Sequence, residues 1–256
     1  RGLTLIELMI ALVIGLLIVA AVSVLFASSS RSRQEIDSSA EVNENGRYAL
    51  DLMSRELAQT GFYGSLAAPA PAATKIPTDM SVANAMCLNG TANLATWQDS
   101  LSYYVLGLGS AGDGTTNIDG DPACMARKVG TDAIFIQRAS TCAIGDPDCP
   151  AESASDAYLQ VSECGSEYSA TPVVLAAGNA GAAVFKLQTK TCAGTAAPKR
   201  KLVRRIYFIS TTNVLSYQDI PLTGALPPPV ARVHGMEQLQ IEYAFDTSAA
   251  PDGTPD

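Results

Sequence analysis

The N-terminal part of the chain, residues 1–30, is one long apolar run with a single acid near its start. No charged side chain occurs from Leu8 to Ala27, and Glu7 stands directly before this run. About 20 apolar residues, each rising about 1.5 Å along a helix, span roughly the 30 Å of a bilayer's hydrocarbon core. A carboxylate at the edge of such a segment costs a few kcal/mol unless it meets a positive charge. The pattern therefore predicts a membrane-spanning helix in which Glu7 needs a cationic partner.

Helical periodicity continues beyond the apolar run, now with polar residues interspersed. From residue 34 to residue 60, apolar side chains recur at helical spacing and form one stripe. Gly61 follows as a C-cap, and the prolines beyond it prevent the helix from continuing. We expect one helix whose second half packs this stripe on a soluble head. The stripe contains Leu50, Met53 and Leu57, with Ala49 and Leu52 on its flanks.

Beyond Gly61 the chain shows short runs rich in β-branched and aromatic residues, which are typical of β-strands. Several alternate: Leu239 and Ile241 fall on one face and Gln240 on the other. The turn at 211–213 predicts a hairpin between the flanking runs. The pattern indicates an α+β fold in which the long N-terminal helix packs on an antiparallel β-sheet head. The expected strands are 101–107, 132–139, 157–162, 183–190, 201–210, 214–218 and 236–245.

Charge and cysteine content narrow the class of protein. The net charge of −8 argues against a protein that holds nucleic-acid phosphates. An even number of cysteines beyond the apolar segment predicts disulfides and an oxidising compartment, with no zinc-type CxxC pair. Fifteen pairings are possible, and we expect neighbours to pair in order, most securely across the tight Asp146–Pro147–Asp148 loop. The six cysteines are Cys87, Cys124, Cys142, Cys149, Cys164 and Cys192.

Residues 2–7, Gly-Leu-Thr-Leu-Ile-Glu, closely resemble the class III signal of type IV pilins and their relatives. The resemblance implies that prepilin peptidase cuts between Gly2 and Leu3 and that the new amino terminus is methylated. The amine of Leu3 would then pair with Glu7 of a neighbouring subunit, which removes two unpaired charges from hydrocarbon. Leu3 departs from the Phe or Met usual in the family, which bears on processing efficiency. A secretory signal peptide and a plain signal anchor are the alternatives. The apolar run is too long for the first and Gly2 lies before it, and the second gives no reason for Glu7.

This resemblance divides the chain into four parts. Residues 1–2 would be the remnant of the leader, and residues 3–30 the transmembrane and pilus-core helix. Residues 31–61 would be the amphipathic helix that packs on the head. Residues 62–256 would form the disulfide-containing, β-rich globular head.

Four later segments resemble PilW-type minor pilins in their sequence and order: 43–64, 131–138, 204–218 and 234–247. The resemblance implies a protein that sits in the bacterial inner membrane with its head in the periplasm and then enters an extracellular pilus. Its implied partners are prepilin peptidase, other minor and major pilins and, in some systems, a PilY-type tip adhesin. PilW-like chains run on into further strands after the segment that ends this sequence. We therefore expect a natural C-terminus beyond residue 256.

Other chemistry-bearing residues give weaker signals. His234 lacks a surrounding catalytic motif, and the Asp-rich loop 107–121 lacks EF-hand spacing. We expect no catalytic residue, metal or cofactor, and we do not expect this chain to be an enzyme. The basic residues clustered at 199–205 could contact DNA or an acidic partner. The alternative is that they lie on an edge strand, where charge commonly prevents aggregation between sheets. The acids considered were Asp113, Asp119, Asp121, Asp246, Asp252 and Asp256, and the basic cluster is Lys199, Arg200, Lys201, Arg204 and Arg205.

Two other functions share these features. A pseudopilin of a type II secretion system uses the same signal and helix. Alternatively, the head itself is an adhesin or a DNA-uptake module, which exposed aromatic residues beside the cluster at 199–205 would favour.

Overall fold

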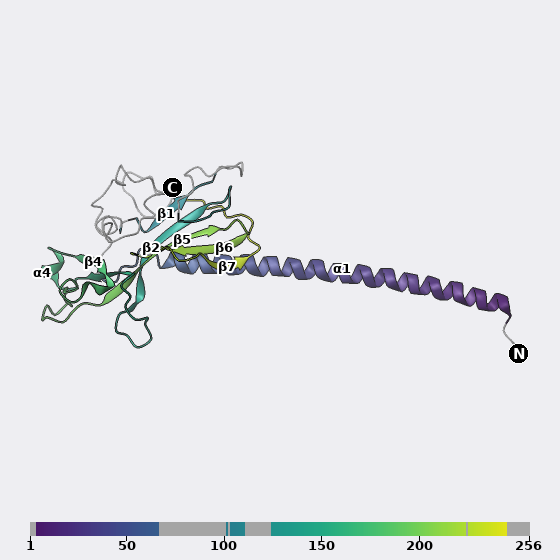
Figure 1. Cartoon of the computed structure of the whole chain (residues 1–256), viewed down its shortest axis with the longest axis horizontal. Coiled ribbons are helices and arrows are strands. Elements are labelled where there is room, and N and C mark those ends of the chain that lie inside the picture. The colour runs from purple at the N-terminus through teal and green to yellow at the C-terminus, as the bar shows by residue number, and fades with distance from the viewer. Residues whose placement is uncertain (1–3, 67–100, 102, 111–123, 224, 245–256) are drawn as a thin grey trace. The chain divides into compact units, whose positions relative to one another are not determined.

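A computed structural model of the chain describes residues 4–66, 101, 103–110, 124–223 and 225–244. The chain divides into two compact units, Arg1–Tyr48 and Ala49–Asp256. Helix α1 (Leu5–Ala58) contributes to both units. The prediction of one long helix that ends just before Gly61 is confirmed (Figure 1).

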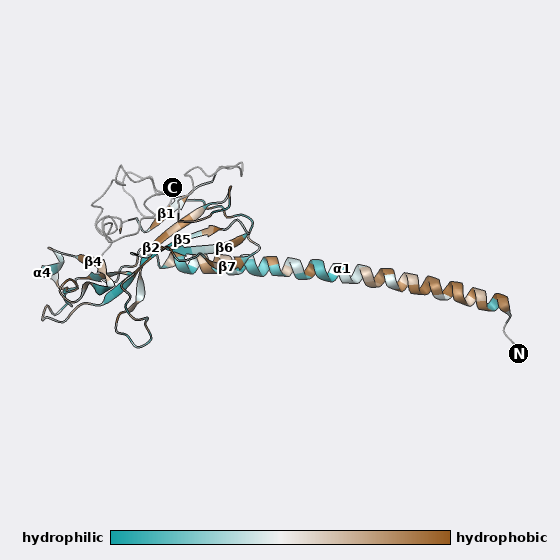
Figure 2. Ribbon diagram, viewed as in Figure 1, coloured by the Kyte–Doolittle hydropathy of each residue, from teal (hydrophilic) through white to brown (hydrophobic). Residues whose placement is uncertain are grey.

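The first unit is helical and exposes its apolar side chains. Leu5 to Phe26 is the strongly apolar half of α1, as the colouring in Figure 2 shows. In the part of the chain that the structure describes, α1 is the one helix long and apolar enough to cross a membrane. A helix that is apolar on every side is stable when lipid or other helices surround it.

The second unit contains a seven-stranded sheet in which all paired strands are antiparallel (Figure 1). Two short helices, α4 (Gly165–Tyr168) and η3 (Gly178–Ala180), lie between its strands. The strands are β1 (Val105–Leu108), β2 (Ala133–Ala143), β3 (Ala157–Val161), β4 (Val173–Ala177), β5 (Lys199–Ile209), β6 (Val214–Asp219) and β7 (Val230–His234).

Strand β5 is the centre of this sheet. One of its edges pairs with β2, from Leu202 opposite Ala139 to Phe208 opposite Ala133. Its other edge is shared, because residues 199–201 pair with β3 and residues 205–209 pair with β6. Strands β3 and β4 therefore extend the sheet from one end of β5, and β6 and β7 extend it from the other end.

Most predicted strands are confirmed, and two are wrong. The runs at 132–139, 157–162, 201–210 and 214–218 are strands, and 101–107 is a strand only from Val105. Residues 183–190 form no strand beyond a single bridge between Gln188 and Ala196. The described residues of 236–245 are not a strand, whereas β4 and β7 were not predicted.

The alternation of apolar and polar residues in 236–243 does not come from a paired strand. This segment runs extended beside the sheet without strand pairing, and Leu239 and Ile241 point into apolar clusters. Asp132 holds it, because the Asp132 N–H donates to the Leu239 carbonyl and its carboxylate accepts from the Ile241 N–H. Alternation is a property of extended backbone, so the sequence pattern alone does not show whether a neighbouring strand is present.

The predicted hairpin between β5 and β6 is confirmed. The Ser210 N–H donates to the Val214 carbonyl at 2.9 Å, and the Asn213 N–H donates to the Ser210 carbonyl at 3.0 Å. Asn213 adopts φ 61°, in the left-handed region that asparagine tolerates better than most residues. The turn thus depends on the asparagine that the sequence places there.

The core lies on both faces of the sheet. On one face Phe135, Ile206 and Phe208 belong to the largest buried cluster. On the other face Tyr207 and Ile209 belong to the clusters that the end of α1 covers. Adjacent residues of β5 alternate between the two faces, as the pleat of a strand requires.

The predicted packing stripe of α1 is partly wrong. Ala49 is 4% exposed, and Leu52 and Met53 pack against the sheet clusters. Leu50 is 74% exposed and Leu57 is 38% exposed, so of the predicted stripe Met53 alone packs on the sheet clusters. Adjacent residues are separated by about 100° around a helix. The buried face is centred on Ala49, Leu52 and Met53, so the Leu50 side chain points away from the sheet.

Candidate functional site

The first turn of α1 is closed by Thr4 and Glu7. The backbone N–H and the hydroxyl of Thr4 donate to Glu7 Oε2 at 2.9 and 2.8 Å. The Glu7 N–H donates back to the Thr4 hydroxyl at 3.4 Å. This is a capping box, in which two backbone donors that no helical carbonyl can reach are satisfied reciprocally. The T-x-x-E spacing of Thr4 and Glu7 carries this signal in the sequence, whereas the prediction for Glu7 rested on its charge alone.

The capping box leaves Glu7 available to a second group. The hydrogen bonds that its carboxylate accepts within the described chain all use Oε2, and its side chain is exposed. A carboxylate in the first turn also lies at the positive end of the helix dipole, which stabilises it. Gly2 and Leu3, the predicted cleavage residues, lie outside the described residues. Their pairing with Glu7 of a neighbour stays a prediction.

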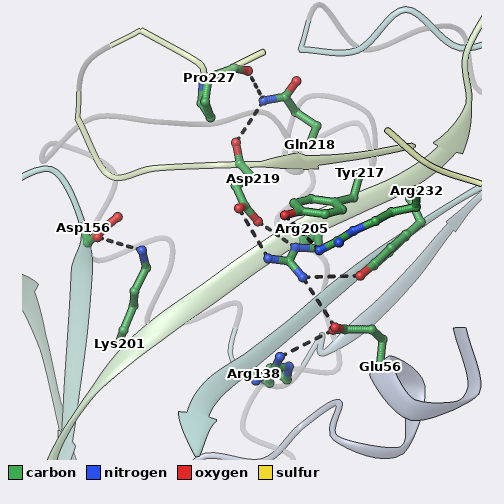
Figure 3. Close-up of polar contacts among 11 residues, drawn as sticks. Glu56, Arg138, Asp156, Lys201, Arg205, Tyr217, Gln218, Asp219, Pro227 and Arg232 are labelled. Atoms are coloured by element: carbon green, nitrogen blue, oxygen red, sulfur yellow. Dashed lines mark hydrogen bonds and ion pairs between the residues drawn. The ribbon is translucent and has the colours of Figure 1, made fainter. Parts of the chain in front are cut away.

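The end of α1 is joined to the sheet by a charge network (Figure 3). The Glu56 carboxylate lies 3.5 Å from Arg138 of β2 and 3.4 Å from Arg205 of β5. Arg205 also binds Asp219 of β6 at 2.7 Å. Burial acts to lower the pKa of Arg205, but the hydrogen bonds and charges of Asp219 and Tyr207 together raise it above its ordinary value. The network therefore joins four elements: the end of α1 and strands β2, β5 and β6.

This network was missed at the level of sequence. The sequence holds one weak signal that Glu56 faces the sheet: it comes seven residues after Ala49 and therefore lies on the same helical face. Nothing in the sequence indicates that Arg138 and Arg205 lie opposite it, because that depends on the pairing of β2 with β5.

A second polar group is buried on the opposite face of the sheet. Gln137 donates to the Tyr63 hydroxyl at 3.2 Å and accepts from Arg204 Nε at 3.0 Å. The Arg204 guanidinium carbon lies 5.2 Å from the centre of the Phe135 ring. Burial lowers the pKa of Arg204 to about 9, so it remains charged at neutral pH. Since Tyr63 follows α1 directly, this network also fixes where the chain leaves the helix.

The basic cluster at 199–205 is not one basic surface. It lies on β5, which is the centre of the sheet, so the prediction of an edge strand is wrong. Lys199 pairs with Glu152, and Lys201 with Asp156. Arg200 donates to the carbonyls of residues 140 and 141, and Arg204 is buried. Alternation along the strand and neighbouring carboxylates divide the positive charge.

Two disulfides follow the expected sequential order: Cys142 with Cys149, and Cys164 with Cys192. Cys124 is disulfide-bonded as well. Cys87 lies outside the described residues. Because these bonds need an oxidising compartment, they agree with a head on the outer side of the membrane.

The remaining candidates do not form a reactive site in the ranges that the structure describes. His234 is exposed at the end of β7. No group of three or more His, Cys, Asp or Glu residues there could hold a metal ion. The acids considered for calcium, Asp113, Asp119, Asp121, Asp246, Asp252 and Asp256, lie outside the described ranges.

Comparison with known families identifies the N-terminus. The prokaryotic N-terminal methylation motif matches residues 1–23. Neither the comparison with curated proteins nor the comparison with solved structures found a match. The matched residues contain the capping box and most of the apolar run of α1. The chain thus carries the signal of type IV pilins and pseudopilins on an α+β, type IV pilin-like architecture.

Proposed function

We propose that this chain is a PilW-like minor pilin that helps to prime the assembly of a type IV pilus and lies near its tip. The methylation motif at the start of an apolar helix is the observation that carries the proposal. The PilW-like segments of the head support the finer assignment. The partners would be other minor and major pilins and, at the tip, a PilY-type adhesin. Prepilin peptidase would process the chain in the inner membrane, between Gly2 and Leu3.

Assembly would use the free oxygen of Glu7. Thr4 holds Oε2, so the methylated amine of a neighbouring subunit would approach Oε1. Pairing the two charges removes the penalty of both from the hydrocarbon and sets the axial register of the helices. The apolar side chains of α1 would supply the packing around this pair.

The test is Glu7→Gln, which keeps the size of the side chain and removes its charge. We expect normal amounts in the membrane but a roughly tenfold loss from sheared filaments. Glu41→Gln is the matched control, because Glu41 is an exposed acid on the same helix. Equal recovery of the Glu7 variant and the wild type in filaments would contradict the proposal.

A pseudopilin of a type II secretion system is the second candidate, because the same motif serves both classes. Deletion of the gene separates them when surface pili are counted with and without the retraction motor. Pili that vanish and return when retraction is blocked support a priming minor pilin. Normal pili with defective protein secretion support a pseudopilin instead.

A further inference from the structure

Strand β7 carries an arginine in an unusual position. Within the described residues β7 forms an edge of the sheet and pairs with β6 alone. The register passes from Val233 opposite Leu215 to Ala231 opposite Ser216, so Arg232 is an extra residue in the strand. Such a bulge redirects the side chain of the inserted residue, and bulges are enriched at sheet edges and beside functional sites.

The bulge directs Arg232 onto Tyr217 (Figure 3). The Arg232 guanidinium donates to the Tyr217 hydroxyl at 3.3 Å, and its carbon lies 4.8 Å from the centre of the ring. Arg205 lies 3.8 Å from the same ring centre. A guanidinium held on an aromatic ring has lost much of its conformational freedom in advance, which lowers the entropic cost of binding a partner.

Arg232 differs from its charged neighbours in having no carboxylate partner. Arg138 pairs with Glu56, and Arg205 pairs with Glu56 and Asp219. No ion pair joins Arg232 to an acid in the part of the chain that the structure describes. Three arginines therefore share two carboxylates, and the excess positive charge lies on the exposed member. This arrangement favours one additional carboxylate at Arg232.

The residues beside Arg232 favour a protein partner. Val230 is 39% exposed, and Ala231 and the prolines at 227–229 are exposed as well. An exposed arginine held on the ring of the buried Tyr217, beside exposed apolar groups, resembles the centre of a protein interface. Prolines and a bulge disfavour pairing by an added strand. A partner would therefore bind through its side chains.

We propose that Arg232, supported by Tyr217, docks an acidic segment of a different pilin-type subunit, one of whose carboxylates binds the guanidinium. The inference rests on the proposed function, because it assigns this contact to the assembled filament. It goes further by naming the face of the head and the charge of its partner.

The first experiment uses Arg232→Lys as a chemical probe in sheared filaments. A zero-length carbodiimide joins a lysine amine to a carboxylate only when the two are in contact. We expect a bond from the new lysine to an Asp or Glu of another subunit, identified by peptide mass spectrometry. The native Lys190, also exposed on the head, is the internal comparison. A bond within the chain, a bond between two copies of this chain, or no bond overturns the proposal.

The second experiment reverses the charge with Arg232→Glu. We expect roughly tenfold less protein in filaments, at an unchanged amount in the membrane and an unchanged Tm. Lys190→Glu makes the same change of charge elsewhere and should be recovered normally. Should Arg232→Glu enter filaments normally while Glu7→Gln does not, the docking inference fails and the proposed function stands. Should Glu7→Gln also enter normally, the proposed function itself fails.

Discussion

Glu56 of α1 and Arg205 of β5 form an ion pair at 3.4 Å, although they are 149 positions apart in the chain. Arg138 contacts the other oxygen of the same carboxylate at 3.5 Å. The three side chains are 13–17% exposed, so water screens this network weakly. The end of α1 is therefore fixed to the sheet by charge as well as by apolar contact.

Glu56→Gln should destabilise the head by about 1–3 kcal/mol, because two largely buried guanidiniums lose a charged partner. Asp219 still serves Arg205, which limits the loss. Asp51→Asn is the control, since the exposed Asp51–Arg55 pair is worth only about 0–0.5 kcal/mol. Thermal unfolding of the full chain in detergent measures both. Equal Tm values for the two variants would show that the network contributes nothing to stability.

The face of α1 that packs on the head can be tested with two truncations. Met53→Ala should cost about 1–3 kcal/mol, because Met53 packs against the sheet clusters. Leu50→Ala removes a similar side chain from an exposed position and should change stability by less than about 0.5 kcal/mol. Denaturant unfolding of the two variants provides the comparison. A larger loss for Leu50→Ala would restore the stripe predicted from the sequence.

Thr4 should matter for assembly through its hydroxyl. Thr4→Val keeps the shape of the side chain but removes one donor to Glu7 Oε2, so the carboxylate is held less firmly. We expect several-fold less of this variant in filaments, whereas Thr4→Ser keeps the hydroxyl and should behave as the wild type. Recovery from sheared filaments, normalised to the amount in the membrane, is the measurement. Identical recovery of the valine and serine variants would exclude a role for the hydroxyl.

Stability should fall in alkali because of Tyr207. Burial raises the pKa of Tyr207 to about 12, against the opposing effect of Arg205. The folded state then binds more protons than the unfolded state above pH 10, and about 2–3 kcal/mol is lost between pH 10 and pH 12. Tyr207→Phe should flatten this part of the curve. Burial of Arg204 acts in the opposite direction, but it contributes equally to both proteins. Parallel curves for the variant and the wild type would refute the prediction.

The parts that could be predicted depend on local pattern. The apolar run predicted the long apolar first half of α1, and Asn213 marked the hairpin turn correctly. The close spacing of Cys142 and Cys149 likewise indicated a local pair. Each of these features is decided by residues within a few positions of one another.

The parts that could not be predicted depend on distant pairing. Whether Leu239 and Ile241 lie in a strand or in an extended crossing segment is decided by Asp132, more than one hundred positions earlier. The exposure of Leu50 follows from the rotation of α1 against the sheet. Arg232 acquired its significance only through a bulge, which shifts the register without any mark in the sequence.

The central position of β5 in the sheet also orders the events of folding. Its contacts with β6 close a short loop, since Ile209 pairs with Leu215. Its contacts with β2 join residues as far apart as Ala133 and Phe208, which carry a larger loop-closure entropy. We expect the hairpin of β5 and β6 to form first and to serve as the template on which β2 and β3 assemble. Substitutions in this hairpin should therefore slow folding, whereas substitutions in β4 should mainly speed unfolding.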